Sequence, residues 1–174
     1  YIMVTLEKFE YTPLEFEPVW DDSFKQFPYA RKAYGDFEQL AKWTQMGFTH
    51  KNFTGEMCSD QTVVPKWAHD IGTLLGWKDC GYTFYRMQVG DILPPHADHF
   101  NKYIEIFNIA DSDDVMRCVV FLEDKKPGHM SEFEGKSVGD WMRGGAVAWR
   151  GRVEHSALNI GYEPRYTLQI TGHA

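Results

Sequence analysis

Two segments in the first half of the chain have apolar residues at helical spacing. In residues 63–77 they recur every three or four positions and define one face, formed by Val64, Trp67, Ala68, Ile71, Leu74 and Leu75. Gly76 is expected to end this helix. A second helix is expected over residues 37–46, with Asp36 as its N-terminal cap and Gly47 just beyond its end.

From about residue 80 the pattern changes to the alternation of apolar and polar positions that is typical of short strands. Glycine and proline interrupt it repeatedly, as at Pro94-Pro95 and Gly144-Gly145. Strands are expected over residues 82–89, 103–109, 116–123 and 165–172, with shorter pieces within 131–149. Many short strands separated in this way indicate a β-sandwich or barrel.

The pattern therefore predicts a mainly β protein with N-terminal helices. We expect a helical layer over about residues 1–79, packed on a jelly-roll over about residues 80–174. A length of 174 residues suits a single domain.

Composition and charge indicate which partners and which cellular location to expect. The formal net charge is -7 and no block of lysine or arginine occurs, so nucleic acid is not an expected partner. The three cysteines, Cys58, Cys80 and Cys118, are odd in number and lack C-x-x-C spacing, which favours a reducing, cytoplasmic location. No apolar run approaches the ~20 residues of a membrane span, and no signal peptide is expected at the start. The pattern does not specify an oligomeric state.

The candidate chemistry begins with His96-Ala97-Asp98, directly after Pro94-Pro95. In an extended segment, residues two apart point the same way, so His96 and Asp98 can share an ion while His99 points to the other side. A third ligand must come from a distant strand, and His155 in "VEHSALNIG" lies 59 residues after His96.

Two histidines and one carboxylate on strand segments form the facial triad of non-haem Fe(II) oxygenases, although other divalent metals fit the same ligands. A single His-x-Asp arises by chance in many proteins, and His155 alone would most simply be a surface or core histidine. The combination, together with the arginine that follows, favours a metal site.

Arg165 lies ten residues after His155 and begins an alternating strand. Thr167, Gln169 and Thr171 share its face, which is polar enough to line a liganded barrel. A guanidinium can bind a carboxylate through two parallel hydrogen bonds, and Thr167 can add a third. The simpler alternative for Arg165 is a surface salt bridge.

Over about residues 80–172, these motifs resemble the Fe(II)/2-oxoglutarate-dependent dioxygenase superfamily, nearest in texture to its prolyl-hydroxylase-like members. The resemblance lies in His96-Ala97-Asp98, the distal His155, and Arg165-Tyr166-Thr167 ten residues later. It extends to the run "GDWMRGGAVAWRGRVEHSALNIGYEPRYTL" around the second histidine.

The resemblance implies a double-stranded β-helix that holds Fe(II) through His96, Asp98 and His155. It also implies 2-oxoglutarate as cosubstrate, bound by Arg165 with help from Thr167 and by Tyr85. Dioxygen would be the second cosubstrate. The implied reaction yields succinate, carbon dioxide and an oxidant that attacks a substrate C–H bond, usually to hydroxylate it.

Four further residues are candidates for substrate contact or for support of the site. Arg117 could contact substrate or cosubstrate, and a buried structural arginine is an equal alternative. Asn101 and Tyr103 follow the metal loop and are expected near the substrate entrance. Asn159 is expected to be a hydrogen-bond partner near the site.

The leading hypothesis is a 2-oxoglutarate-dependent hydroxylase that acts on a peptide residue, such as a prolyl residue, or on a small molecule. One alternative is a cupin-like metal oxygenase that does not use 2-oxoglutarate, against which Arg165 counts. Another is a non-catalytic jelly-roll that keeps metal as a binding or structural element. A degenerate member would be expected to lack one of the four key residues, and this chain has them all.

Overall fold

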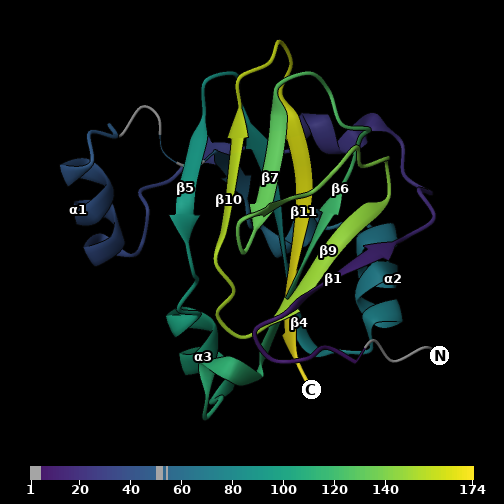
Figure 1. The fold of residues 1–174 in the computed structure, drawn as a ribbon. Coiled ribbons are helices and arrows are strands. Elements are labelled where there is room, and N and C mark those ends of the chain that lie inside the picture. The colour runs from purple at the N-terminus through teal and green to yellow at the C-terminus, as the bar shows by residue number, and fades with distance from the viewer. Residues whose placement is uncertain (1–4, 50–52, 54) are drawn as a thin grey trace.

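The computed structural model describes residues 5–49, 53 and 55–174, and within them the strands form two antiparallel sheets (Figure 1). The seven-stranded sheet has the order β1 (Tyr11–Glu15), β9 (Gly145–Arg150), β6 (Val115–Phe121), β11 (Arg165–His173), β4 (Lys78–Met87), β3 (Glu56–Cys58) and β2 (Ala30–Arg31). The four-stranded sheet has the order β5 (Ile92–His96), β10 (His155–Asn159), β7 (His129–Phe133) and β8 (Lys136–Ser137). Short 3-10 helices cover Asp22–Gln26, Gln61–Val63 and Ser112–Asp114.

The chain alternates between the sheets from β4 to β11. Strands β4, β6, β9 and β11 lie in the larger sheet, whereas β5, β7, β8 and β10 lie in the smaller one. This winding is a double-stranded β-helix, one form of the jelly-roll. Three strands from before residue 79 extend the larger sheet, so the expected boundary near residue 80 does not separate helices from strands.

Strand β11 shows how the larger sheet separates two cores. Leu168 and Ile170 are fully buried on the outer face, where they pack in one cluster with residues of α2 (Lys66–Leu75). Arg165, Thr167 and Gln169 face the space between the sheets, as the alternation predicts. The space between the sheets also holds a second apolar cluster, formed by Phe121, Phe133, Trp141, Val147, Trp149 and Val153.

Helix α2 ends at Gly76, whose φ of 73° is the left-handed conformation expected of a glycine C-cap. Ala68, Ile71 and Leu75 are buried as predicted, but Leu74 is 60% exposed, so its assignment to the buried face is wrong. Leu74 is adjacent to Leu75 and therefore points about 100° away from it around the helix.

Helix α1 (Phe37–Gln45) begins as predicted, because the Asp36 side chain accepts a hydrogen bond from the Gln39 backbone N–H. The helix lies beside β5 rather than over the larger sheet (Figure 1). Its buried Trp43 contacts His96, with ring centroids 5.6 Å apart. This helix therefore supports the end of β5.

The strand expected over residues 103–109 is wrong, because Asn101–Phe107 form helix α3. Phe100 and Asn108 adopt left-handed backbone conformations that bound the helix at either end. Ile106 is 60% exposed and Phe107 38%, so the apolar residues here do not mark a buried strand face. Among the described residues, no helix is long and apolar enough to cross a membrane.

Candidate metal centre

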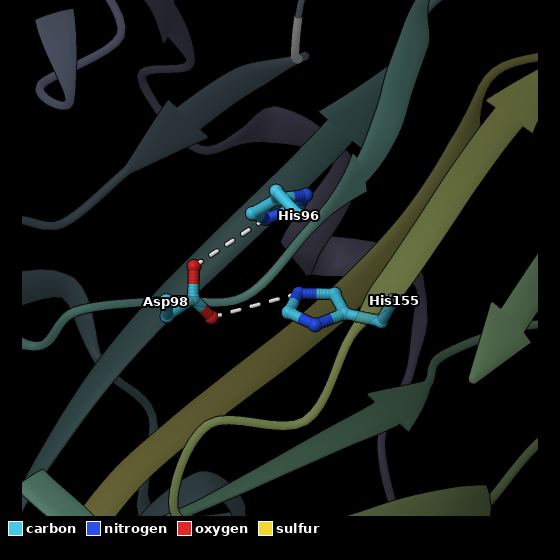
Figure 2. Close-up of side chains that lie close together, drawn as sticks. All are labelled: His96, Asp98 and His155. Carbon is cyan, nitrogen blue, oxygen red and sulfur yellow. Dashed lines mark ion pairs between the residues drawn. The ribbon is translucent and has the colours of Figure 1, made fainter. Parts of the chain in front are cut away.

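His96, Asp98 and His155 lie together at one end of the smaller sheet (Figure 2). His96 ends β5, His155 begins β10, and the two are register partners across that strand pair. Asp98 follows two residues after His96. Its Oδ1 lies 3.4 Å from His96 Nε2, and its Oδ2 lies 3.5 Å from His155 Nε2. One ligand atom from each residue fits within 4.8 Å of the others, so the group could hold a metal ion.

Both imidazole rings are oriented by the backbone. His96 Nδ1 lies 2.8 Å from the carbonyl oxygen of Pro94, and His155 Nδ1 lies 2.9 Å from that of Val153. A carbonyl only accepts, so each Nδ1 carries the hydrogen and donates it. The Nε2 lone pairs are left to face Asp98. Such outer hydrogen bonds fix the tautomer and orientation of metal-binding histidines.

The charges at the site also suit a divalent metal. Burial lowers the pKa of His155 to about 4, so its imidazole is neutral at neutral pH. Burial acts to raise the pKa of Asp98, but Arg117 and the two histidines outweigh it and hold that pKa well below its usual range. A neutral imidazole and a carboxylate are the protonation states that metal coordination requires.

A cavity of about 150 Å³ runs between the sheets from the triad to Arg165. Arg165 and Thr167 line it from β11, and Tyr85 lines it from β4, where it is the register partner of Thr167. Burial raises the pKa of Tyr85, so its phenol remains protonated and can donate a hydrogen bond. The structure thus brings all three expected cosubstrate residues to one cavity.

Arg165 is a buried cation, and no carboxylate in the described part of the chain pairs with it. It is 7% exposed, and its guanidinium contacts the Ser131 hydroxyl and, at 3.7 Å, the sulfur of Met87. The rings of Trp141 and Phe121 lie 5.3 and 5.7 Å from it. Its Nε has no hydrogen-bond partner in the part of the chain that the structure describes. Burial lowers the pKa of Arg165 to about 10, which still leaves it charged at neutral pH.

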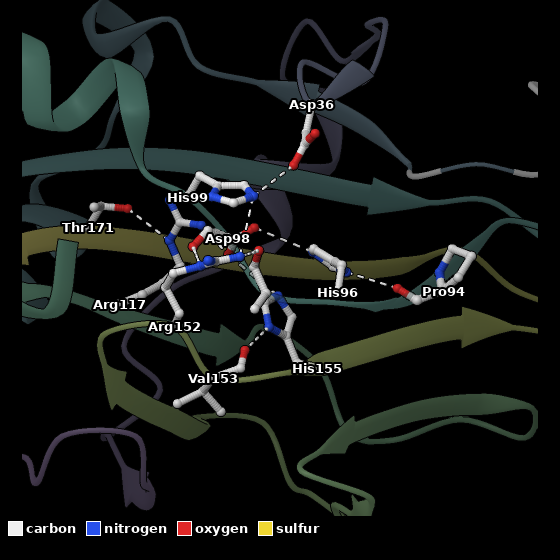
Figure 3. A network of polar contacts seen from close by, with 11 residues as sticks. Asp36, Pro94, His96, Asp98, His99, Arg117, Arg152, Val153, His155 and Thr171 are labelled. Atoms are coloured by element: carbon white, nitrogen blue, oxygen red, sulfur yellow. Dashed lines mark hydrogen bonds and ion pairs between the residues drawn. The ribbon is translucent and has the colours of Figure 1, made fainter. Parts of the chain in front are cut away.

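Arg117 also lines the cavity, next to the metal triad. Its Nη1 lies 2.5 Å from Asp98 Oδ2, and its Nε donates to the Thr171 hydroxyl at 3.1 Å (Figure 3). The arginine therefore contacts a candidate metal ligand directly.

The structure does not bring Asn101, Tyr103 or Asn159 into the cavity lining. Asn101 and Tyr103 belong to α3, and the Tyr103 hydroxyl donates to the backbone oxygen of Asp79 at 3.1 Å. Asn159 is fully buried, and its amide donates to the backbone oxygens of Met87 and Glu163 at 2.9 and 2.8 Å. Its contacts join strand ends instead of facing the metal site.

Sequence reasoning missed several residues that line the cavity. Ser131 and Phe133 come from β7, Met57 from β3 and Leu93 from β5. Tyr34 comes from the segment before α1, and its ring lies edge-on to His96 with centroids 6.0 Å apart. Alternation along β7 could have placed Ser131 and Phe133 on one face, but no local signal marks Tyr34.

No protein-family model matches the chain, and no curated protein matches its sequence. Solved structures do match. A prolyl-4-hydroxylase from Pseudomonas putida is 18% identical with a TM-score of 0.43, over 94% of this chain and 69% of that chain. A predicted oxalate decarboxylase from Thermotoga maritima is 13% identical with a TM-score of 0.41, over 68% of this chain and 80% of that one.

The non-heme alpha-ketoglutarate-dependent epimerase SnoN from nogalamycin biosynthesis gives a TM-score of 0.56 at 14% identity. The match covers 94% of this chain and 78% of that chain. At this identity the similarity establishes the fold alone. The chain therefore shares its double-stranded β-helix fold with a non-heme, alpha-ketoglutarate-dependent enzyme.

Proposed function

We propose that the protein is an Fe(II)- and 2-oxoglutarate-dependent dioxygenase that hydroxylates a C–H bond of a peptide residue or a small molecule. The overall reaction consumes 2-oxoglutarate, dioxygen and substrate, and gives succinate, carbon dioxide and hydroxylated product. One observation carries the proposal: a single cavity has a His-Asp-His group at one end and, at the other, a buried arginine with no carboxylate partner among the described residues.

The metal end of the cavity fits Fe(II). His96, Asp98 and His155 would hold it, and their two imidazoles and one carboxylate are the donor set of non-haem iron oxygenases. When bound, the ion would supply open coordination positions and the redox chemistry that activates dioxygen. The backbone carbonyls of Pro94 and Val153 hold the rings in the required tautomer.

The arginine end of the cavity fits a carboxylate. A buried guanidinium without a counter-ion is costly, and a bidentate carboxylate would both neutralise it and satisfy Nε. Thr167 and Tyr85 can each add a hydrogen bond from the same side. A dicarboxylate with one end at Arg165 and the other at the triad is therefore the ligand that the cavity favours.

The remaining walls of the cavity are apolar and would help to keep water out. Met57, Met87, Leu93 and Phe133 supply apolar surface between the two polar ends. Excluding water protects a reactive oxidant from side reactions and strengthens the charge interactions inside.

The test is succinate formation by protein loaded anaerobically with Fe(II) and then given 2-oxoglutarate and air. Slow turnover without added substrate is expected, and His155→Ala should abolish it. Asp98→Ala should also be inactive, because two ligands alone do not hold the metal in a defined position. Calorimetry on protein loaded with redox-inert Mn(II) under nitrogen measures 2-oxoglutarate binding separately.

The two measurements also separate the alternatives. Metal binding with no affinity for 2-oxoglutarate would contradict the proposal and favour a cupin-like oxygenase. Binding of both without any decarboxylation, even in a screen of peptides and small molecules, would favour a non-catalytic protein.

A further inference from the structure

Asp98 differs from the two histidines in how it is held. His96 and His155 lie at the paired ends of β5 and β10, so the strand pairing places both. Asp98 lies beyond β5, in the loop that leads to α3, where no sheet pairing fixes it. Its carboxylate is instead held by Arg117, which comes from β6 in the opposite sheet (Figure 3).

Arg117 is itself fixed at three points. Nη1 donates to Asp98 at 2.5 Å, Nε donates to the Thr171 hydroxyl at 3.1 Å, and the guanidinium lies 4.7 Å from the centre of the Phe100 ring. Thr171 is the register partner of Arg117 on β11, so this anchor belongs to the larger sheet. The Arg117 side chain is only 15% exposed and Asp98 19%, so water screens their pairing weakly.

The loop backbone adopts a costly conformation that brings Phe100 to this guanidinium. Phe100 has a φ of 60° and a buried side chain, although bulky residues rarely adopt the left-handed region. Such a conformation persists only where surrounding contacts impose it, and it is found most often at functional sites. Phe100, Arg117 and Asp98 thus form one packed unit.

A second arginine holds the loop from outside. Arg152 is exposed, and its guanidinium donates to the backbone oxygens of Asp98 and Ala97 at 3.3 and 3.4 Å (Figure 3). These hydrogen bonds are longer than the one from Arg117 to Asp98, and they reach backbone oxygens rather than the carboxylate. Arg117 is therefore the residue that determines which carboxylate oxygen remains for a metal.

We infer that Arg117 is a positioning residue that makes Asp98 a single-oxygen metal ligand, by retaining Oδ2 in a charge-assisted hydrogen bond. A carboxylate that bound through both oxygens would use one more coordination position. The proposed function, on which this inference rests, needs three positions for cosubstrate and dioxygen. Outer hydrogen bonds to metal ligands typically contribute 10–100-fold to metal affinity.

The test uses Co(II) titration of the metal-free protein, followed by calorimetry and visible absorption. Arg117→Gln removes the positive charge and the planar guanidinium of the side chain, and it is expected to weaken Co(II) binding by about 10–100-fold. Its Co(II) spectrum should also change, because d–d absorption responds to coordination number. Simple charge repulsion predicts the opposite sign, since removing a cation near a metal ion should strengthen binding.

Two further variants isolate positioning from general stability. Arg150→Gln is the matched control, because Arg150 on β9 pairs with Asp114 at the same 2.5 Å but lies outside the cavity. It should leave both Co(II) affinity and spectrum unchanged. Thr171→Val retains the charge of Arg117 and removes only its Nε anchor, so a smaller loss of affinity in the same direction is expected.

The outcomes are distinguishable. If the unmodified protein fails to bind Co(II), the proposed function fails first. If it binds and Arg117→Gln binds equally well or more tightly with the same spectrum, the positioning role is overturned. A weaker, spectrally altered Arg117→Gln beside an unchanged Arg150→Gln supports the role.

Discussion

Arg165 and the metal triad differ in how their buried charges are compensated in the ligand-free protein. The triad includes a carboxylate that is already neutralised by Arg117, so its burial is compensated. Arg165 has no such partner among the described residues, and its positive charge is buried against aromatic rings and a thioether. Its one contact with the Ser131 hydroxyl does not neutralise that charge, which is why we assign Arg165 to ligand binding.

Replacing Arg165 with methionine should therefore separate stability from binding. We expect Arg165→Met to leave the unfolding free energy of the ligand-free protein unchanged or raised, because an apolar side chain suits the buried position. The same change should weaken 2-oxoglutarate binding by about 2–4 kcal/mol, the usual cost of removing a buried charge partner. Urea unfolding and calorimetry measure the two effects. Unchanged affinity for 2-oxoglutarate would exclude the assigned role of Arg165.

His129 gives a prediction about pH. Burial, chiefly, lowers the pKa of its imidazole below the ordinary 6.5, while its Nε2 lies 2.9 Å from the Glu163 carbonyl oxygen. Near and below pH 6.5 this imidazole is therefore protonated more fully in the unfolded chain than in the folded one, so its effect is to reduce the unfolding free energy as the pH is lowered. Glutamine retains the donor and does not titrate. The loss of unfolding free energy between about pH 8 and pH 5 should thus be smaller in His129→Gln, as measured by urea unfolding.

Single residues were predictable where a strand fixed their direction. Two-residue alternation placed Arg165 with Thr167 on β11, and it also grouped His96 with Asp98, although Asp98 lies in the loop just beyond β5. The structure brings both pairs to one cavity. Tyr34 could not be found in this way, because its position depends on how a loop packs on His96. Proximity to His155 in sequence likewise does not fix which way a strand end faces, and the Asn159 amide donates to the backbone oxygens of Met87 and Glu163.

At the scale of elements, the helices show how much secondary structure can be predicted from the spacing of apolar residues. Helix α2 combines an apolar face with a glycine stop, and its predicted end at Gly76 agrees with the structure. The helix begins at Lys66, three residues after the start of the predicted segment. Residues 103–109 mix apolar and polar residues in a pattern that fits either a strand or a short helix, and tertiary context selects the helix. Neither sheet order nor the placement of α1 beside β5 is encoded in local periodicity.

The corrected face of α2 can be tested with two neighbouring leucines. Leu75 is fully buried against the larger sheet, so Leu75→Ala should lower the unfolding free energy by about 2–5 kcal/mol. Leu74 is 60% exposed, and Leu74→Ala should change the unfolding free energy by less than about 0.5 kcal/mol. Chemical unfolding of both variants under identical conditions measures the difference. Equal losses would contradict the observed orientation of the helix.

At the scale of the whole molecule, the site depends on both sheets. The histidines and Ser131 come from the smaller sheet, and Arg117 and Arg165 come from the larger one. Sequence alone supplied the two histidines and the two arginines, but it indicated neither Ser131 nor that the sheets face each other across these side chains. That arrangement arises from long-range strand pairing, which no local pattern reports.

Metal binding should therefore stabilise the entire fold. A ligand that binds only the folded state raises the unfolding free energy by about 2.7 kcal/mol when its concentration is 100 times Kd. We expect added Mn(II) to raise the thermal midpoint of the native protein and to have little effect on His96→Ala. Differential scanning calorimetry with and without Mn(II) provides the measurement. A similar shift in both proteins would place the bound ion elsewhere.

The contact between Arg165 on β11 and Ser131 on β7 is a bond between the two halves of the barrel. A dicarboxylate held by Arg165 at one end and by a metal on the smaller sheet at the other would connect those halves a second time. Opening the barrel would then require the release of a small molecule. Backbone amides of β10 and β11 should consequently exchange with solvent more slowly, and together, once the cavity is filled.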